Sequence, residues 1–181
     1  MLLTPASRLC VVDLQGRLLA AVQGRDGVLA RCVALAKAAA LLGVPAAATE
    51  QNPAGIGPTV PELAAHIPTV FGKATFDAAR APGFLDWARG GGPVVLAGTE
   101  THVCVLQTAL GLKAAGLDVA CVADACGSRR PSDHAAALAR LSAAGVAVLT
   151  TEMVLFEWLG RYDRAEFRPV LSLIKGLPLA E

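Results

Sequence analysis

Residues 94–108 read VVLAGTETHVCVLQT, and this stretch decides how the rest of the chain is interpreted. Its first four residues are apolar and predict a buried strand that ends at Gly98. A segment of helical length follows and begins near Thr101. A strand followed at once by a helix is half of a βαβ unit. Cys104 lies in the first turn of the predicted helix, so its thiol is either a packing residue or a nucleophile.

The same alternation continues along the chain in both directions. Segments of helical length at 27–42, 101–116 and 132–144 separate short apolar runs. Apolar strands separated by helices are typical of a parallel sheet that helices cover on both faces. The sequence therefore predicts one α/β domain over residues 1–181, a three-layer Rossmann-like fold with a six-stranded parallel sheet. The expected strands are 9–12, 46–48, 69–71, 94–97, 119–123 and 146–149.

Composition excludes several classes of protein. The chain has 16 Lys and Arg against 15 Asp and Glu, and a net charge of +1 does not indicate a partner such as nucleic acid. Hydrophobic residues make up 54% of the chain, but charges interrupt every apolar run before it reaches membrane-spanning length. A large core and an apolar contact between copies account for this fraction, so we expect a homo-oligomer, a dimer or higher.

The amino terminus and the cysteines indicate a cellular compartment. No basic region followed by a cleavable apolar stretch begins the sequence, which predicts a cytoplasmic protein. The five cysteines are odd in number and lack CxxC spacing, which argues against a disulfide framework and against a zinc site. We expect reduced thiols, most of them buried.

Three residues able to do chemistry follow predicted strands. Asp13 follows the first strand, Lys73 the third and Cys104 the fourth. The carboxyl ends of parallel strands meet at one edge of the sheet, where ligands bind. With Thr101 as the N-cap, free backbone N–H groups and the helix dipole would lower the pKa of the Cys104 thiol from about 8.5. Asp13 is then placed to accept the thiol proton, and Lys73 to stabilise both negative charges.

Each of these residues also has a simpler interpretation. Cys104 can be a small apolar residue of the core, as most of the other cysteines are expected to be. Asp13 can cap the turn that follows it, and Lys73 can be a solvated surface lysine. Position alone leaves both interpretations open.

In this order the three residues resemble the catalytic triad of the isochorismatase-like cysteine hydrolases. Gly98, Thr101 and Cys104 match the family pattern Gly-x-x-Thr-x-x-Cys, and the resemblance covers almost the whole chain. It is closest to the isochorismatase-domain-containing subfamily, through TEQNPAGIGPTVPEL at 49–63 and DACGSR at 124–129.

The resemblance implies the strand order 3-2-1-4-5-6 and a set of roles. Cys104 would attack an electrophilic carbon, Asp13 would transfer protons and Lys73 would hold the charges in place. A cis peptide between Thr99 and Glu100 would turn the N–H groups of Glu100 and Cys104 toward an oxyanion. The implied function is a metal-independent hydrolase of a small amide-type or related substrate, acting through a thioester-like intermediate.

The segment after the second strand separates this chain from metal-dependent relatives. Nicotinamidases of the same superfamily bind a metal through an Asp-x-His motif and a further histidine, and the equivalent loop here contains no histidine. We therefore expect neither a metal nor another cofactor. Residues 50–63 hold three prolines and two glycines, too many for a helix, and we expect them to shape the pocket. The candidates for substrate contacts are Gln51, Asn52, Phe71, Thr101 and His102.

Some of these assignments have alternatives. His102 can equally be a surface histidine at a helix start, and Asp124 and Arg129 are expected to brace the edge loops. Two other functions also stay open for the whole protein. It can be a catalytically silent interaction protein of the same fold, or a thiol-based redox protein in which Cys126 resolves an oxidised Cys104.

Overall fold

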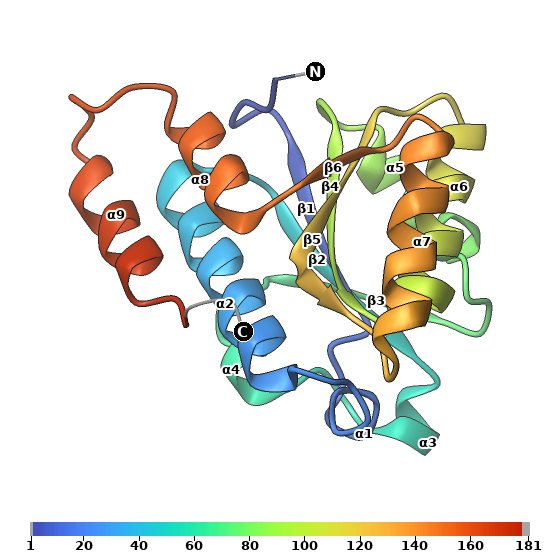
Figure 1. Ribbon diagram of the computed structural model, residues 1–181. Helices are drawn as coiled ribbons and strands as arrows, with labels where there is room; N and C mark the ends of the chain where they lie inside the picture. The colour runs from blue at the N-terminus through green and yellow to red at the C-terminus, as the bar shows by residue number, and fades with distance from the viewer. Residues whose placement is uncertain (1, 179–181) are drawn as a thin grey trace.

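Six parallel strands lie side by side in one sheet at the centre of the molecule (Figure 1). In the computed structural model, which describes residues 2–178, the strand order is β3-β2-β1-β4-β5-β6. The predicted α/β class and strand order are confirmed. The strands are β1 (Arg8–Val12), β2 (Ala46–Gln51), β3 (Thr69–Lys73), β4 (Val94–Thr99), β5 (Val119–Gly127) and β6 (Ala147–Leu149).

Helices cover both faces of the sheet, as strands without polar alternation require. Helices α2, α4, α8 and α9 lie on one side of the sheet, and α5, α6 and α7 lie on the other (Figure 1). Among residues 2–178, no helix is both long and apolar enough to cross a lipid bilayer. The helical segments are α1 (Gly16–Leu19), α2 (Arg25–Leu42), α3 (Pro53–Ile56), α4 (Pro61–Ala64), the 3-10 turn η1 (Ala78–Arg80), α5 (Phe84–Ala88), the π-helical turn η2 (Thr101–Val105), α6 (Leu106–Ala114), α7 (Pro131–Ala143), α8 (Thr151–Leu159) and α9 (Phe167–Lys175).

The side chains of β1 alternate between two separate cores. Leu9 and Val11 lie in the core shared with α2, whereas Cys10 and Val12 lie in the core shared with α5, α6 and α7. All four side chains are completely buried. Burial on both faces explains why this strand has no polar alternation in the sequence.

Two helix predictions are wrong in detail. The segment 101–116, predicted as one helix, is the π-helical turn η2 followed by α6, which ends at Ala114. The prolines of residues 50–63 were expected to exclude a helix, yet α3 and α4 both form there. Each has only four residues and begins at a proline, the position in a helix where the missing N–H costs nothing.

Strand β5 is longer than predicted and irregular. It continues to Gly127, whereas the sequence predicts an end at residue 123. Its pairing with β4 shifts along the way, because Leu96 pairs with Cys121 while Gly98 pairs with Cys126. The extra residues bulge out of the ladder between these pairs.

Candidate active site

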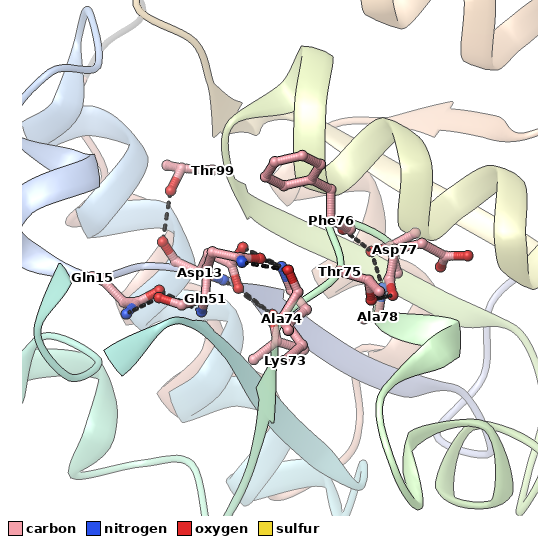
Figure 2. Close-up of polar contacts among 12 residues, drawn as sticks. Asp13, Gln15, Gln51, Lys73, Ala74, Thr75, Phe76, Asp77, Ala78 and Thr99 are labelled. Atoms are coloured by element: carbon pink, nitrogen blue, oxygen red, sulfur yellow. Dashed lines mark hydrogen bonds and ion pairs between the residues drawn. The ribbon is translucent and has the colours of Figure 1, made fainter. Parts of the chain in front are cut away.

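Asp13 and Lys73 form a buried ion pair at the carboxyl ends of β1 and β3. Lys73 Nζ lies 2.7 Å from Asp13 Oδ2, and both side chains are completely buried (Figure 2). Two charges removed from water cost free energy that only close contact and further hydrogen bonds offset. The structure thus brings together the two charged residues that the sequence singled out.

Two threonines fix Asp13 from neighbouring strands. Thr49 of β2 donates its hydroxyl to Asp13 Oδ1 at 2.6 Å. Thr99 of β4 donates its hydroxyl to the Asp13 carbonyl at 2.7 Å (Figure 2). The Asp13 backbone lies in the left-handed region, with φ at 46°. Sequence analysis missed Thr49, although its place at the end of a buried strand was a usable signal.

Gln51 supports Lys73. Its Oε1 accepts a hydrogen bond from Lys73 Nζ at 2.7 Å, and its Nε2 donates to the Ala74 carbonyl at 2.9 Å (Figure 2). Gln15, which sequence analysis also missed, holds the Gln51 backbone by accepting from its N–H at 2.8 Å. The predicted substrate-contact residue Gln51 therefore has its side-chain amide engaged by the protein itself.

Strand β4 has no room for a side chain at Gly98, next to β1. A Cβ atom there would overlap the Val12 carbonyl oxygen, and the φ angle of 112° is unfavourable for any other residue. Glycine thus permits the backbones of β1 and β4 to approach closely just before Asp13 and Thr99.

Cys104 lies in the π-helical turn η2 and is 5% exposed. Burial and the negative charge of Asp13 raise the pKa of the thiol to about 12, whereas Lys73 opposes this shift. The predicted lowering of this pKa is wrong. Sequence position places the thiol near the start of a helix but does not reveal how deeply it is buried.

Thr101 is not the helix cap that the sequence predicts. The capping position of η2 is Glu100, and Thr101 Oγ1 instead lies 2.9 Å from Nδ1 of His134 on α7. Burial lowers the pKa of His134, which favours the neutral ring. Thr101 therefore ties the turn that carries Cys104 to a neighbouring helix.

The Thr99–Glu100 peptide bond is cis. The Glu100 carboxylate is clamped by Arg129, with Nη2 to Oε1 at 2.6 Å and Nε to Oε2 at 3.0 Å. This hydrogen bonding holds the pKa of Glu100 below its usual value. Arg129 braces the edge of the site, as the sequence predicts.

Asp124 also has the bracing role that the sequence predicts. It accepts hydrogen bonds from the Thr151 backbone and hydroxyl at 2.7 and 2.9 Å, and it pairs with Arg31 Nε at 3.2 Å. These contacts join β5 to α8 and α2. A cavity of about 780 Å³ borders this cluster and extends to Ser128 and His134.

The other predicted substrate contacts lie around this centre. Asn52 is exposed in the left-handed region, with φ at 41°, directly before α3. Phe71 packs edge-on against Phe84, with ring centroids 5.4 Å apart. His102 Nδ1 lies 3.0 Å from Ser128 Oγ. The Asn52 N–H donates to the Lys73 carbonyl at 3.3 Å, and Phe71 packs against the core that contains Cys104.

All five cysteines are free and buried. The sulfur of Cys126, the resolving residue of the redox alternative, lies 3.7 Å from that of Cys121, on the other side of the bulge of β5. Within residues 2–178, no group of three or more His, Cys, Asp or Glu side chains could hold a metal ion.

Comparison with known proteins gives consistent matches. The family model described as Isochorismatase domain matches residues 7–153. Isochorismatase domain-containing protein 2 of Bos taurus is 37% identical over 171 residues, covering 94% of this chain and 83% of that protein. The structure of MAR1 ribonuclease from Caenorhabditis elegans has a TM-score of 0.92 at 33% identity and covers 100% of both chains. The Escherichia coli YcaC gene product, described as an octameric hydrolase of unknown specificity, has a TM-score of 0.85 at 27% identity, covering 98% of this chain and 89% of that one.

Proposed function

The chain belongs to the isochorismatase family, and we propose that it is a cysteine hydrolase of a small amide-type or related substrate, with Cys104 as nucleophile. The observation that carries the proposal is the fully buried pair of Asp13 and Lys73, whose charges both act on the Cys104 thiol. A buried ion pair adds little stability by itself, so its place beside a thiol favours a role in proton transfer.

The raised pKa of Cys104 defines what Asp13 must do. A thiol with a pKa of about 12 is protonated at neutral pH, so attack on a carbonyl carbon needs a base at the moment of reaction. Asp13 takes the thiol proton as the Cys104 sulfur bonds to carbon, and the carbonyl oxygen becomes an oxyanion. Lys73 stabilises the negative charges on both partners. The N–H groups of Glu100 and Cys104 are the proposed donors to the oxyanion.

The second half of the reaction returns the enzyme to its starting state. As the tetrahedral intermediate collapses, the carbon–nitrogen bond breaks and Asp13 gives its proton to the leaving amine. Water then attacks the thioester carbon and loses a proton to Asp13. The carbon–sulfur bond breaks, the acid leaves and the proton returns to Cys104. No step requires a metal or another cofactor, so activity should survive chelation.

Assembly and location belong to the same proposal. The YcaC product of Escherichia coli is described as octameric, and α8 of this chain exposes Met153 and Phe156, which are 52% and 41% accessible. We propose a homo-oligomer that covers apolar residues of this kind. Free thiols at all five cysteines are consistent with a reducing compartment such as the cytoplasm.

The name of one relative supplies a second candidate function. The Caenorhabditis elegans structure at 33% identity is described as a ribonuclease, so RNA is a substrate to test directly. The net charge of +1 argues against this function for the present chain, because RNA-binding surfaces are usually basic.

A hydrolysis screen tests both candidates. The purified protein is incubated with small amides, ureas, imides and enol ethers, and separately with single-stranded and double-stranded RNA. Cys104→Ala should abolish turnover of the small substrate, whereas Cys126→Ala, which removes a thiol of similar burial, should retain it. RNA cleavage that survives Cys104→Ala, with no turnover of any small molecule, would contradict the proposal.

A further inference from the structure

Thr49 is the fourth residue of β2, and its side chain is completely buried against Asp13. Its hydroxyl donates to Asp13 Oδ1 at 2.6 Å, and its carbonyl accepts from the Asp13 N–H at 3.1 Å. The same hydroxyl lies 3.3 Å from the Asp13 nitrogen. Backbone and side chain of one residue therefore fix both ends of Asp13.

Side chains on the two faces of β2 have different roles. Thr49 and Gln51 share one face of the strand, because side chains two residues apart point the same way. Thr49 binds Asp13, and Gln51 binds Lys73 at 2.7 Å. Glu50 faces the opposite side, where it accepts from the backbone and hydroxyl of Thr59 at 2.7 and 2.8 Å. One face of β2 thus holds the ion pair, and the other anchors the loop after it.

We propose that Thr49 is a positioning residue that holds Asp13 in the orientation needed to take the Cys104 proton. This inference rests on the proposed cysteine chemistry. With Oδ1 bound to Thr49 and Oδ2 bound to Lys73, the carboxylate cannot rotate without losing a hydrogen bond.

The Thr49 hydroxyl is important for Asp13 because few other charged or titratable groups act on this site. The charged and titratable groups that act on this site are Lys73 from β3, Cys10 from β1 and Cys104 from η2. Lys73 is the only cation among them. Without Thr49, Asp13 Oδ1 would lose its hydroxyl donor in a buried site, and the carboxylate would turn.

The test is the rate at which iodoacetamide alkylates Cys104, followed by peptide mass spectrometry from pH 5 to 9. Thr49→Val removes the hydroxyl at nearly constant volume, and Thr49→Ser keeps it. We expect alkylation in Thr49→Val to be about tenfold slower at neutral pH, the scale of one hydrogen bond to a charged group. Thr49→Ser should restore the wild-type rate.

Thr151→Val is the matched control. Thr151 is also completely buried and donates its hydroxyl to a carboxylate, that of Asp124, at 2.9 Å. Its loss should leave the alkylation profile of Cys104 unchanged. Should Thr49→Val not fold, Thr49→Ala compared with Thr49→Ser asks the same question.

The outcomes separate the two proposals. Selective alkylation of Cys104 with the same pH profile in wild type and Thr49→Val would overturn the role of Thr49 and leave Cys104 as the nucleophile. A profile shifted equally by Thr151→Val would overturn it too, because the effect would then be general. No selective alkylation of Cys104 in the wild type would overturn the proposed cysteine chemistry, and the role of Thr49 with it.

Discussion

Two clusters in this protein contain the same four kinds of group. At the first cluster, Asp13 binds the Thr49 hydroxyl through Oδ1 and the Lys73 cation through Oδ2. The charge of Asp13 contributes to the raised pKa of the Cys104 thiol. At the second, Asp124 binds the Thr151 hydroxyl through Oδ1 and the Arg31 cation through Oδ2. The negative charge of Asp124 contributes to a raised pKa of the thiol in this cluster, that of Cys32.

The difference between the clusters lies in the cation and in the burial. Lys73 acts on both the carboxylate and the thiol, so it lowers the pKa of Cys104 against the effect of burial. Arg31 is committed to Asp124 and to two backbone carbonyls, and it does not contribute to the raised pKa of Cys32. Asp13 is completely buried, whereas the Asp124 side chain is 33% exposed. The two clusters therefore differ in one respect that bears on the proposed chemistry: Lys73 acts on both the carboxylate and the thiol, whereas Arg31 acts on the carboxylate alone.

The largest expected effect compares the two thiols. Cys104→Ala should lower kcat/KM for the hydrolysed substrate by at least about 10³-fold, as removal of a nucleophile does. Cys32→Ala should keep the wild-type rate, although it empties a small buried volume. Similar losses in the two variants would show that the difference between the clusters is not catalytic.

The second prediction compares the two cations. Lys73→Met leaves Asp13 buried without its partner and should cost about 3–5 kcal/mol of unfolding free energy in urea. It should also move alkylation of Cys104 to higher pH, because Lys73 lowers this pKa. Arg31→Met should cost less than Lys73→Met, because the Asp124 side chain is 33% exposed and keeps the Thr151 hydroxyl and backbone as donors. A larger loss in Arg31→Met would reverse the comparison.

The third prediction concerns the clamp on the turn that carries Cys104. The pKa of Glu100 is lowered in the folded state, so its contribution to stability is present above its unfolded value of 4.5 and is lost as pH falls through the folded value. Glu100→Gln should therefore melt a few degrees below wild type at pH 7. The difference in melting temperature between the variant and wild type should become smaller as the pH drops below 4.5. A difference that is constant with pH would rule out a stabilising contribution from ionised Glu100.

The smallest expected effect belongs to the second cluster alone. Thr151→Val removes one hydroxyl from Asp124, which keeps the Thr151 backbone and Arg31 as partners. Unfolding free energy should fall by about 0.5–1 kcal/mol, with unchanged turnover. A change in kcat larger than twofold would mean that the two clusters are coupled.

Much of the fold could be predicted because β1 and its neighbours are buried on both faces. An apolar run such as 9–12 has one physical explanation once helices flank it, and the sheet follows. The π-helical turn at Thr101–Val105 could not be predicted in the same way. Its sequence suits an ordinary helix start, and contacts from elsewhere, such as that of His134 with Thr101, are not visible in the local pattern.

Some of the candidate site residues could be predicted because ligands bind at the carboxyl ends of the strands in a parallel sheet. Asp13 and Lys73 were found because parallel strands bring their carboxyl ends together, and the structure joins them in one ion pair. The raised pKa of the Cys104 thiol could not be predicted in this way. Burial depends on the whole fold, whereas the effect of a helix terminus on the thiol is estimated from one element alone. Thr49 escaped attention, and Gln51 was predicted as a substrate contact and not as a partner of Lys73, since a polar residue at a strand end does not reveal which face it occupies.

The central place of β1 in the sheet has a consequence for the order of synthesis. Asp13 leaves the ribosome early and can meet Thr49 once β2 is made, but Lys73 is translated later and Cys104 later still. Until β4 arrives, one edge of β1 stays unpaired, and it offers a nascent apolar strand to chaperones or to other chains. A chain stalled before residue 94 should therefore be held by chaperones and lack the proposed nucleophile, Cys104. Activity would begin only when the second half of the sheet has been translated.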